Sequence, residues 1–203
     1  MGKTFLYSDP HFSHKGVCVF TQADGVTPLR PWDTPEEMDE ALIKNFNDTV
    51  DVDDKVYFLG DTVINRRGLK VLDRLNCRNA VLIKGNHDIF RLDEFTSYFR
   101  DIRAYHVLNG MILSHIPIHA DSLARFGVNI HGHLHSNRVM KPTGFNKNTG
   151  EIIYSKTEID PRYFCVCVEQ TDFKPIEIEE VKRRVVAQGG STEFKKNGNG
   201  PTL

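Results

Sequence analysis

A mixed α/β fold is predicted by three observations on this 203-residue chain. Short β-prone runs alternate with helical patterns in the first hundred residues, a polar cluster stops each run abruptly, and neither a repeat nor a linker divides the chain. Strands that alternate with helices favour parallel pairing through helical crossovers. The length favours a single compact core. We expect one domain over residues 1–183, followed by a disordered, polar tail over residues 184–203.

The first predicted strand covers residues 3–8 and ends at Asp9-Pro10-His11. A β-prone run that stops at such a cluster is typical of a strand leading into a functional loop. A helix is predicted to begin after Thr34, because Thr34, Pro35 and Glu37 form a capping box with proline at the first helical position. Its apolar face is indicated by residues at three- and four-residue spacing, namely Met38, Ala41, Leu42, Phe46 and Val50.

Two further strands are predicted at residues 55–59 and 80–84, and each is closed by a polar motif. The motifs are Gly60-Asp61 and Gly85-Asn86-His87-Asp88. A short helix between the two strands is indicated by Leu69, Leu72 and Leu75. Because ligands bind at the carboxyl ends of strands in parallel sheets, we expect three strand ends to converge on one rim.

The second half of the chain predicts antiparallel pairing. Residues 105–108 and 111–114 form the two arms of an expected hairpin, joined by Asn109-Gly110 as a type I′ turn. Further strands are expected at residues 128–130, 151–155 and 163–169, and a short helix around residues 178–184.

Charge and composition limit the possible partners. The chain has 26 Lys and Arg against 27 Asp and Glu, so neither a stable nucleic-acid partner nor an anionic membrane is expected. No apolar run approaches the roughly 20 residues that cross a bilayer, and the N-terminus does not resemble a signal peptide. We therefore expect a cytoplasmic protein with reduced cysteines. Cys165 and Cys167 share one face of a predicted strand, where core thiols are a better interpretation than a metal clamp.

Histidine carries the strongest functional signal. Eight of the nine histidines, all but His106, lie in four tight clusters at or just after predicted strand ends. A single Asp or Asn after a strand is usually a turn former. Taken together, however, the loops at these strand ends offer imidazole nitrogens and carboxylate oxygens as ligands for Mn, Fe or Zn. The candidate ligands are Asp9, His11, Asp61, Asn86, His115, His133 and His135. Seven ligands exceed the needs of one ion, whereas two ions that share a carboxylate can use them all and can activate water for attack at phosphorus.

Five motifs, in this order, resemble the calcineurin-like metallophosphoesterases of small bacterial and bacteriophage type. They are Asp9-Pro10-His11, Gly60-Asp61, Gly85-Asn86-His87-Asp88, Ser114-His115 and Gly132-His133-Leu134-His135. The resemblance covers residues 7–135 and extends to about residue 183. It implies a four-layer α/β/β/α sandwich of two mixed sheets. It also implies two divalent metal ions, with Mn²⁺ favoured over Fe, Zn or Ni.

The resemblance also implies a role for each candidate residue. Asp9, His11 and His135 would hold the first ion, and Asn86, His115 and His133 the second. Asp61 would bridge the two ions. His87 is similar to the family's histidine that does not bind metal, faces the scissile phosphate and acts as the catalytic residue.

The substrate is less determined. Protein Ser/Thr phosphatases of this family carry Asp-Arg-Gly after the glycine-aspartate motif, where this chain has Asn65-Arg66-Arg67-Gly68. They also carry a glutamate after Gly-Asn-His, where this chain has Asp88. Both differences disfavour protein phosphatase activity. The residues beyond the core are too few for the capping and DNA-binding regions of the related repair nucleases. We expect a phosphodiesterase or phosphatase that acts on a small, nucleotide-like phosphate ester. The alternatives are an inactive metal-binding scaffold of the same fold and a nuclease on single-stranded nucleic acid.

Three further residues are candidates for substrate binding, and each has an ordinary alternative. His14 and His119 could reach the phosphate or orient a ligand, and Arg66, like Lys84, could supply positive charge or simply face solvent. His131 is better interpreted as structural. Residues 15–32 could cap the pocket and stack on a base, or form a packed surface loop. No pattern predicts an oligomeric state.

Overall fold

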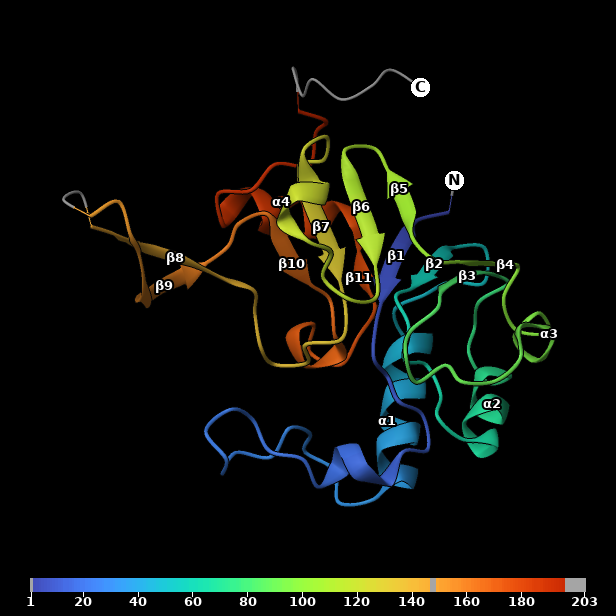
Figure 1. Ribbon diagram of the computed structural model, residues 1–203. Coiled ribbons are helices and arrows are strands. Elements are labelled where there is room, and N and C mark those ends of the chain that lie inside the picture. Colours follow the sequence, from blue (N-terminus) through green and yellow to red (C-terminus); the bar gives the residue numbers. More distant parts are fainter. Residues whose placement is uncertain (1, 147–148, 196–203) are drawn as a thin grey trace.

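Two sheets pack against each other in the computed structural model, which describes residues 2–146 and 149–195 (Figure 1). The first sheet has the strand order β11-β1-β2-β3-β4. Strands β1 to β4 are parallel and β11 is antiparallel to β1, so the predicted parallel pairing of the first half is confirmed. The strands are β1 (Thr4–Tyr7), β2 (Lys55–Phe58), β3 (Asn79–Ile83), β4 (Asp101–Arg103) and β11 (Ile176–Glu177).

One face of this sheet is covered by α1 (Pro35–Asn47), α2 (Arg66–Leu72) and α3 (Leu92–Phe95). The predicted start of α1 is confirmed, since Thr34 caps it and its Oγ1 accepts a hydrogen bond of 3.2 Å from the Glu37 N–H. The predicted apolar stripe lies against the sheet, with the Phe46 ring stacked 5.7 Å from Phe58 of β2. The apolar spacing of α1 thus fixes which way the helix faces.

The second sheet has the order β10-β7-β6-β5. Its strands are β5 (His106–Leu108), β6 (Met111–Ser114), β7 (Val128–His131) and β10 (Tyr163–Cys165). The predicted hairpin is confirmed, because β5 and β6 pair antiparallel. The expectation of antiparallel pairing elsewhere in this half is wrong for this sheet, since β6, β7 and β10 are parallel. Long crossovers return the chain to the start of each strand, and the first of them contains the 3-10 helix η2 (Ala120–Leu123).

The turn of this hairpin differs from the predicted type I′. Such a turn needs positive φ at both central residues, and here Asn109 has φ 55° while Gly110 is outside the left-handed region. Glycine is required at 110 for another reason. A Cβ on Gly110 would lie 2.1 Å from the backbone carbon of Glu193, so the C-terminal segment approaches too closely for any side chain.

The core between the sheets draws on both of them. Leu6 and Val81 of the first sheet share an apolar cluster with Leu113 and Ile130 of the second. The predicted C-terminal helix, α4 (Ile178–Ala187), is confirmed and adds Val181 to this same cluster. The opposite face of the second sheet carries a smaller cluster, to which η2 contributes a leucine.

Two segments extend the fold beyond what was predicted. The strand expected at residues 151–155 is the longer β9 (Ile152–Ile159), which pairs with β8 (Met140–Phe145) in an exposed arm that projects from the molecule (Figure 1). The domain boundary expected at residue 183 falls inside α4, and residues 188–195 continue on the surface of the domain, where the Lys195 N–H donates to the Arg125 carbonyl. Residues 196–203 of the expected tail lie outside the described residues. Every described helix is too short or too polar to cross a membrane.

Candidate metal centre

The register of the parallel strands gathers the motif loops at one edge. Tyr7 pairs with Phe58, so the loops after β1 and β2 leave the first sheet side by side, and the Asp9 N–H donates to the Gly60 carbonyl over 3.1 Å. In the second sheet, Ser114 pairs with His131, and the Gly132 N–H donates to the His115 carbonyl over 2.9 Å. The loops after β1, β6 and β7 carry three of the four histidine clusters, and the loop after β2 carries Asp61.

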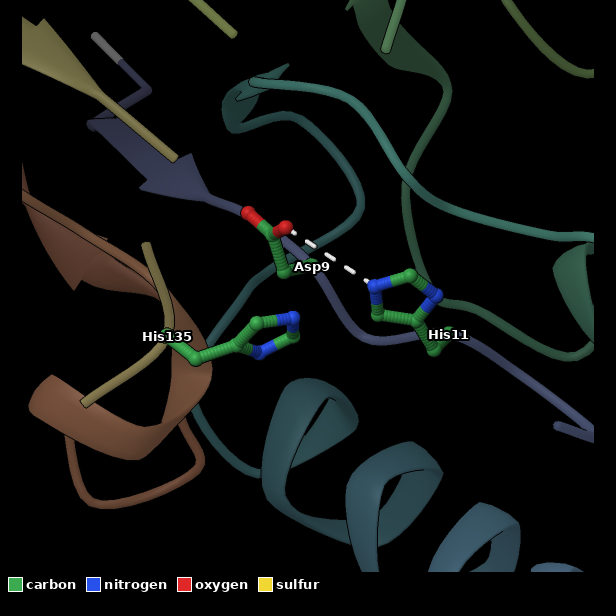
Figure 2. A group of neighbouring side chains, drawn as sticks. All are labelled: Asp9, His11 and His135. Atoms are coloured by element: carbon green, nitrogen blue, oxygen red, sulfur yellow. Dashed lines mark ion pairs between the residues drawn. The ribbon is translucent and has the colours of Figure 1, made fainter. Parts of the chain in front are cut away.

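Two groups of three side chains could each hold a metal ion. The first consists of Asp9, His11 and His135, whose side chains point toward one another in Figure 2. The second consists of Asp61, His115 and His133. Within each group the ligand atoms lie within 4.8 Å of one another. These are six of the seven predicted ligands, and Asp61, the predicted bridge, falls in the second group.

Asp61 lies between the two groups. Its Oδ2 is 3.7 Å from Nε2 of His11 in the first group and 3.4 Å from Nε2 of His115 in its own group. His11 Nε2 is in turn 3.8 Å from Asp9 Oδ1, the ion pair that is dashed in Figure 2. A carboxylate in this position can contact ions in both groups.

The seventh predicted ligand, Asn86, lies beside the second group. Its Oδ1 is 2.9 Å from Nε2 of His115. On the other side of the ring, His115 Nδ1 is 2.8 Å from the Leu59 carbonyl, an acceptor that requires a proton on Nδ1. This hydrogen bond fixes the tautomer in which Nε2 is free to bind a metal.

Buried polar atoms without partners support a cation at the first group. Asp9 is fully buried and His11 is 2% exposed. Among the described residues, Asp9 Oδ1 and both ring nitrogens of His11 are buried with no hydrogen-bond partner. Buried polar atoms are normally paired, because leaving one unpaired costs about 1–3 kcal/mol. A bound divalent ion would satisfy Asp9 Oδ1 and one ring nitrogen of His11, so the residues fit a metal.

The pKa shifts at the site also favour a bound cation. Burial alone would lower the pKa of His115, but its hydrogen bond to Asp61 and the charges of Asp9 and Asp61 outweigh burial and raise the pKa to about 9. Burial would raise the pKa of Asp61, yet the same partnership lowers it to about 2. The site thus favours a positive charge between these side chains, which a metal ion would supply in place of the proton.

The backbone is strained at the predicted ligands. Among the described residues, nine that are not glycine have positive φ, and five of these are predicted ligands: Asp9, His11, Asp61, His133 and His135. Left-handed backbone is uncommon for such residues and gathers at functional sites. Glycines make room beside them, since a Cβ on Gly85 would lie 2.2 Å from Asp61 Oδ1 and one on Gly132 would lie 2.3 Å from Asp9 Oδ2. The positions of the ligand side chains therefore depend on this left-handed backbone and on the glycines beside it.

Asp88, which the motif analysis assigned no role, anchors two of the ligand loops. It is fully buried, and its Oδ2 accepts hydrogen bonds from the N–H groups of Asp61 (2.9 Å) and Gly85 (2.8 Å). Its Oδ1 accepts from the N–H and the hydroxyl of Thr62. The sequence signal for this role is that Asp88 directly follows Gly85-Asn86-His87.

Donors saturate one oxygen of Asp9. Its Oδ2 accepts from the Ser8 hydroxyl (2.5 Å), the His133 N–H (2.9 Å) and the Cys167 thiol (3.2 Å). Oδ1 is thereby left as the oxygen available to a metal. Cys167 is thus a partner of a candidate ligand, in addition to being a core thiol.

Glu169 and Arg30 support His135 from outside the motifs. Glu169 Oε1 is 3.0 Å from His135 Nδ1, and the fully buried Arg30 side chain donates to the same oxygen over 2.9 Å. Arg30 also donates to the Asp9 and Pro10 carbonyls. Arg30 therefore anchors residues 15–32 beside the first group. No local sequence signal pointed to either role, since Arg30 and Glu169 are 139 residues apart.

His87 and His14 lie beside the first group without belonging to it. The His87 ring is 5.3 Å from that of His11, and its N–H donates to Asp61 Oδ1 over 2.8 Å. The His14 ring is 5.6 Å from His11 and 6.5 Å from His87, and its own neighbour is Phe20 at 6.4 Å. Both histidines can reach a group held at the centre.

The other two predicted substrate-binding residues have different partners. His119 is an exposed N-cap of η2 whose Nδ1 accepts from the Asp121 N–H. Arg66 forms an ion pair with Glu94 and lies over the Phe90 ring at 5.1 Å. The structure does not join either one to the ligand groups. His131 is buried with its Nδ1 against the Gly132 carbonyl, as its structural interpretation predicted.

Comparison with known proteins places the chain in a family. It is 31% identical over 191 residues to the uncharacterized protein MJ1445 of Methanocaldococcus jannaschii, an alignment that spans 91% of this chain and 92% of the relative. The chain belongs to the same family as MJ1445. No family model matches this member of the MJ1445 family. A solved structure, the protein of unknown function AQ665 from Aquifex aeolicus, is similar with a TM-score of 0.61 at 20% identity, and covers 91% of this chain and all of that one. That likeness shows a shared fold.

Proposed function

We propose that the protein is a dinuclear metal-dependent phosphoesterase that acts on a small, nucleotide-like phosphate ester. The observation that carries this proposal is the position of Asp61 Oδ2, within 3.7 Å of His11 in one ligand group and 3.4 Å of His115 in the other. Two adjacent sites that share a carboxylate are the arrangement that in-line displacement at phosphorus uses. The proposal includes assignment of the mixed α/β fold to the four-layer metallophosphatase sandwich.

Each group would hold one ion, with Mn²⁺ as the first choice for a set of imidazoles and carboxylates. Asp9, His11 and His135 would hold one ion, while Asn86, His115 and His133 would hold the other. Two bound ions would polarise the ester and activate water for attack. The protein would orient the ligand rings: the Leu59 carbonyl holds the ring of His115, and the Glu169 carboxylate holds the ring of His135.

His87 would act on the ester itself. Its backbone N–H donates to Asp61 Oδ1, and its ring lies 5.3 Å from that of His11. From there it can donate a hydrogen bond to a phosphoryl oxygen or deliver a proton to the leaving oxygen. His14 lies next to it and would contact the same phosphate.

The direct test is hydrolysis of bis-p-nitrophenyl phosphate by purified protein, first stripped with EDTA and then supplied with Mn²⁺, Fe²⁺, Zn²⁺ or Ni²⁺. We expect release of p-nitrophenolate that depends on the metal and is abolished by Asp61→Ala. Binding of two metal ions without turnover of this ester, of monoesters or of cyclic nucleotides would instead identify an inactive scaffold. Cleavage of a single-stranded oligonucleotide in preference to these small esters would identify the nuclease alternative.

A further inference from the structure

A cavity of about 540 Å³ opens beside the second ligand group. The candidate ligands Asn86 and His115 both line it, so one end of the cavity is the candidate metal site itself. Its other walls come from the segment between β4 and β5 and from the segment that follows β6. The volume falls in the range of about 300–1,000 Å³ that is typical of small-molecule sites.

Exposed apolar side chains line the outer part of this cavity. Tyr105 is 60% exposed and Ile116 is 52% exposed, although both are large and apolar, and Ile112 contributes a buried wall. Two such side chains beside a candidate catalytic centre are the pattern expected of a ligand-binding wall. An aromatic ring that is open on one face can stack on a planar ligand.

Other residues of the cavity wall have different chemistry. They include the candidate ligands His115 and Asn86 and the cationic residue Lys84. The wall therefore combines polar and cationic residues, two of them candidate ligands, with aromatic and apolar ones. A molecule with an anionic phosphate joined to a planar aromatic group matches both sets of residues.

We propose that this cavity binds the organic group of the ester and that this group is a nucleoside, with its base against Tyr105 and Ile116 and its phosphate toward Lys84 and the ligand groups. This proposal rests on the proposed function, because it assigns the substrate class of the same site. It makes Tyr105 a specificity residue rather than a catalytic one, since it contacts the base and not the reacting bond.

A second cavity, of about 660 Å³, does not share these properties. It is lined by Arg30, Glu169 and Arg138 among others, and none of the seven candidate ligands is in its wall as the described residues define it. Its volume is larger, but its wall includes Arg30 and Glu169, which support His135, and not a candidate ligand itself. The 540 Å³ cavity is therefore the one assigned to substrate.

Two diesters with a common chromophore test the assignment. Thymidine 5′-(p-nitrophenyl phosphate) and methyl p-nitrophenyl phosphate both lose p-nitrophenolate when the oxygen of water bonds to phosphorus, and they differ only in the group retained. We expect kcat/KM to be higher for the thymidine ester. Tyr105→Ala should lower the ratio of the two kcat/KM values about 10- to 100-fold, whereas Tyr105→Phe should retain it, because base stacking needs the ring and not the hydroxyl.

Tyr154→Ala is the matched control, since Tyr154 is a 74% exposed tyrosine on β9, in the projecting arm. This variant should leave the ratio unchanged. An unchanged ratio in Tyr105→Ala, or an equal fall in both tyrosine variants, would overturn the proposal.

A binding measurement separates this proposal from the function on which it rests. Saturation-transfer NMR with thymidine, which carries no phosphate, should show contact with the metal-free wild-type protein and loss of contact in Tyr105→Ala. If no ester is turned over with any metal, the proposed function fails while thymidine binding still reports on the cavity. If thymidine makes no contact with the wild-type protein, the nucleoside assignment fails even where bis-p-nitrophenyl phosphate is hydrolysed.

Discussion

Glu169 Oε1 lies 3.0 Å from Nδ1 of His135, inside the protein and 34 residues away in sequence. The Glu169 side chain is 3% exposed and also pairs with Arg30 at 2.8 Å. Burial alone would raise the pKa of Glu169, but the Arg30 charge and the His135 hydrogen bond lower it overall. An ionised carboxylate holds the His135 proton on Nδ1 and directs Nε2 toward Asp9 and His11.

Replacing this carboxylate should weaken the first metal site. We expect Glu169→Ala to lower Mn²⁺ affinity there about 10- to 100-fold, the usual effect of losing the partner of a metal-binding histidine. Isothermal titration of EDTA-stripped protein measures this. Glu158→Ala, a change of an exposed glutamate on β9, is the control. Equal affinities in the wild type and Glu169→Ala would contradict the orienting role.

Removing the His87 imidazole should affect turnover and not metal content. Because this ring is a neighbour of His11 and is not part of either ligand group, we expect His87→Ala to lower kcat about 10²- to 10⁴-fold. Elemental analysis should still find two ions per chain. Loss of metal in this variant would show that His87 is a ligand and not the catalytic residue.

Asp61→Asn should disturb both ions at once. Its Oδ2 is close to both ligand groups, so neutralising it removes negative charge from two sites. We expect metal stoichiometry to fall by more than one ion per chain at micromolar Mn²⁺. His133→Ala is the comparison, since His133 belongs to the second group alone and its loss should spare the first ion. Identical stoichiometries for the two variants would argue against a bridge.

Adding a methyl group at Gly132 should disturb the packing around Asp9, a member of the first ligand group. Its Cβ would lie 2.1 Å from Ser8 Oγ and 2.3 Å from Asp9 Oδ2, so one of these buried groups must move. We expect Gly132→Ala to destabilise the metal-free protein by about 1–3 kcal/mol in urea unfolding, the usual cost of overpacking. Gly25→Ala is the control, because nothing lies within 4 Å of its added Cβ although its φ of 71° adds some strain. A smaller loss at Gly132 than at Gly25 would refute the close fit.

The contribution of His115 to the stability of the metal-free protein should fall as pH rises from about 6.5 to 9. The pKa of His115 is raised from its ordinary 6.5 to about 9 in the folded state, so the folded protein binds more protons than the unfolded chain in this window. That stabilisation is complete below the unfolded pKa and is lost as pH passes the folded one. Urea unfolding of the wild type and of His115→Gln in EDTA across this range measures it, as the difference between the two free energies of unfolding. A difference that does not shrink as pH rises through the window would contradict the His115 and Asp61 partnership.

Local signals determined the first half of the fold and most of the candidate site. The cap at Thr34 and the apolar spacing of α1 act within one or two helical turns, so the sequence alone predicts where the helix begins and which face it buries. The metal-capable residues stand at strand ends, and a parallel sheet brings its strand ends to one edge whatever the loops do. For this reason Asp9, Asp61 and Asn86 could be predicted as neighbours from the sequence.

Only the tertiary structure decided the rest. The parallel pairing of β6 with β7 depends on a crossover that returns the chain to the start of the strand, and the hairpin signal at Asn109-Gly110 carries no information about it. Arg30 and Glu169 meet across 139 residues, where no spacing rule applies, because contacts at that distance are set by the packing of whole sheets and loops. The residues that could bind metal could thus be identified from sequence alone. Packing decided which partners orient them and which apolar side chains line the cavity beside them.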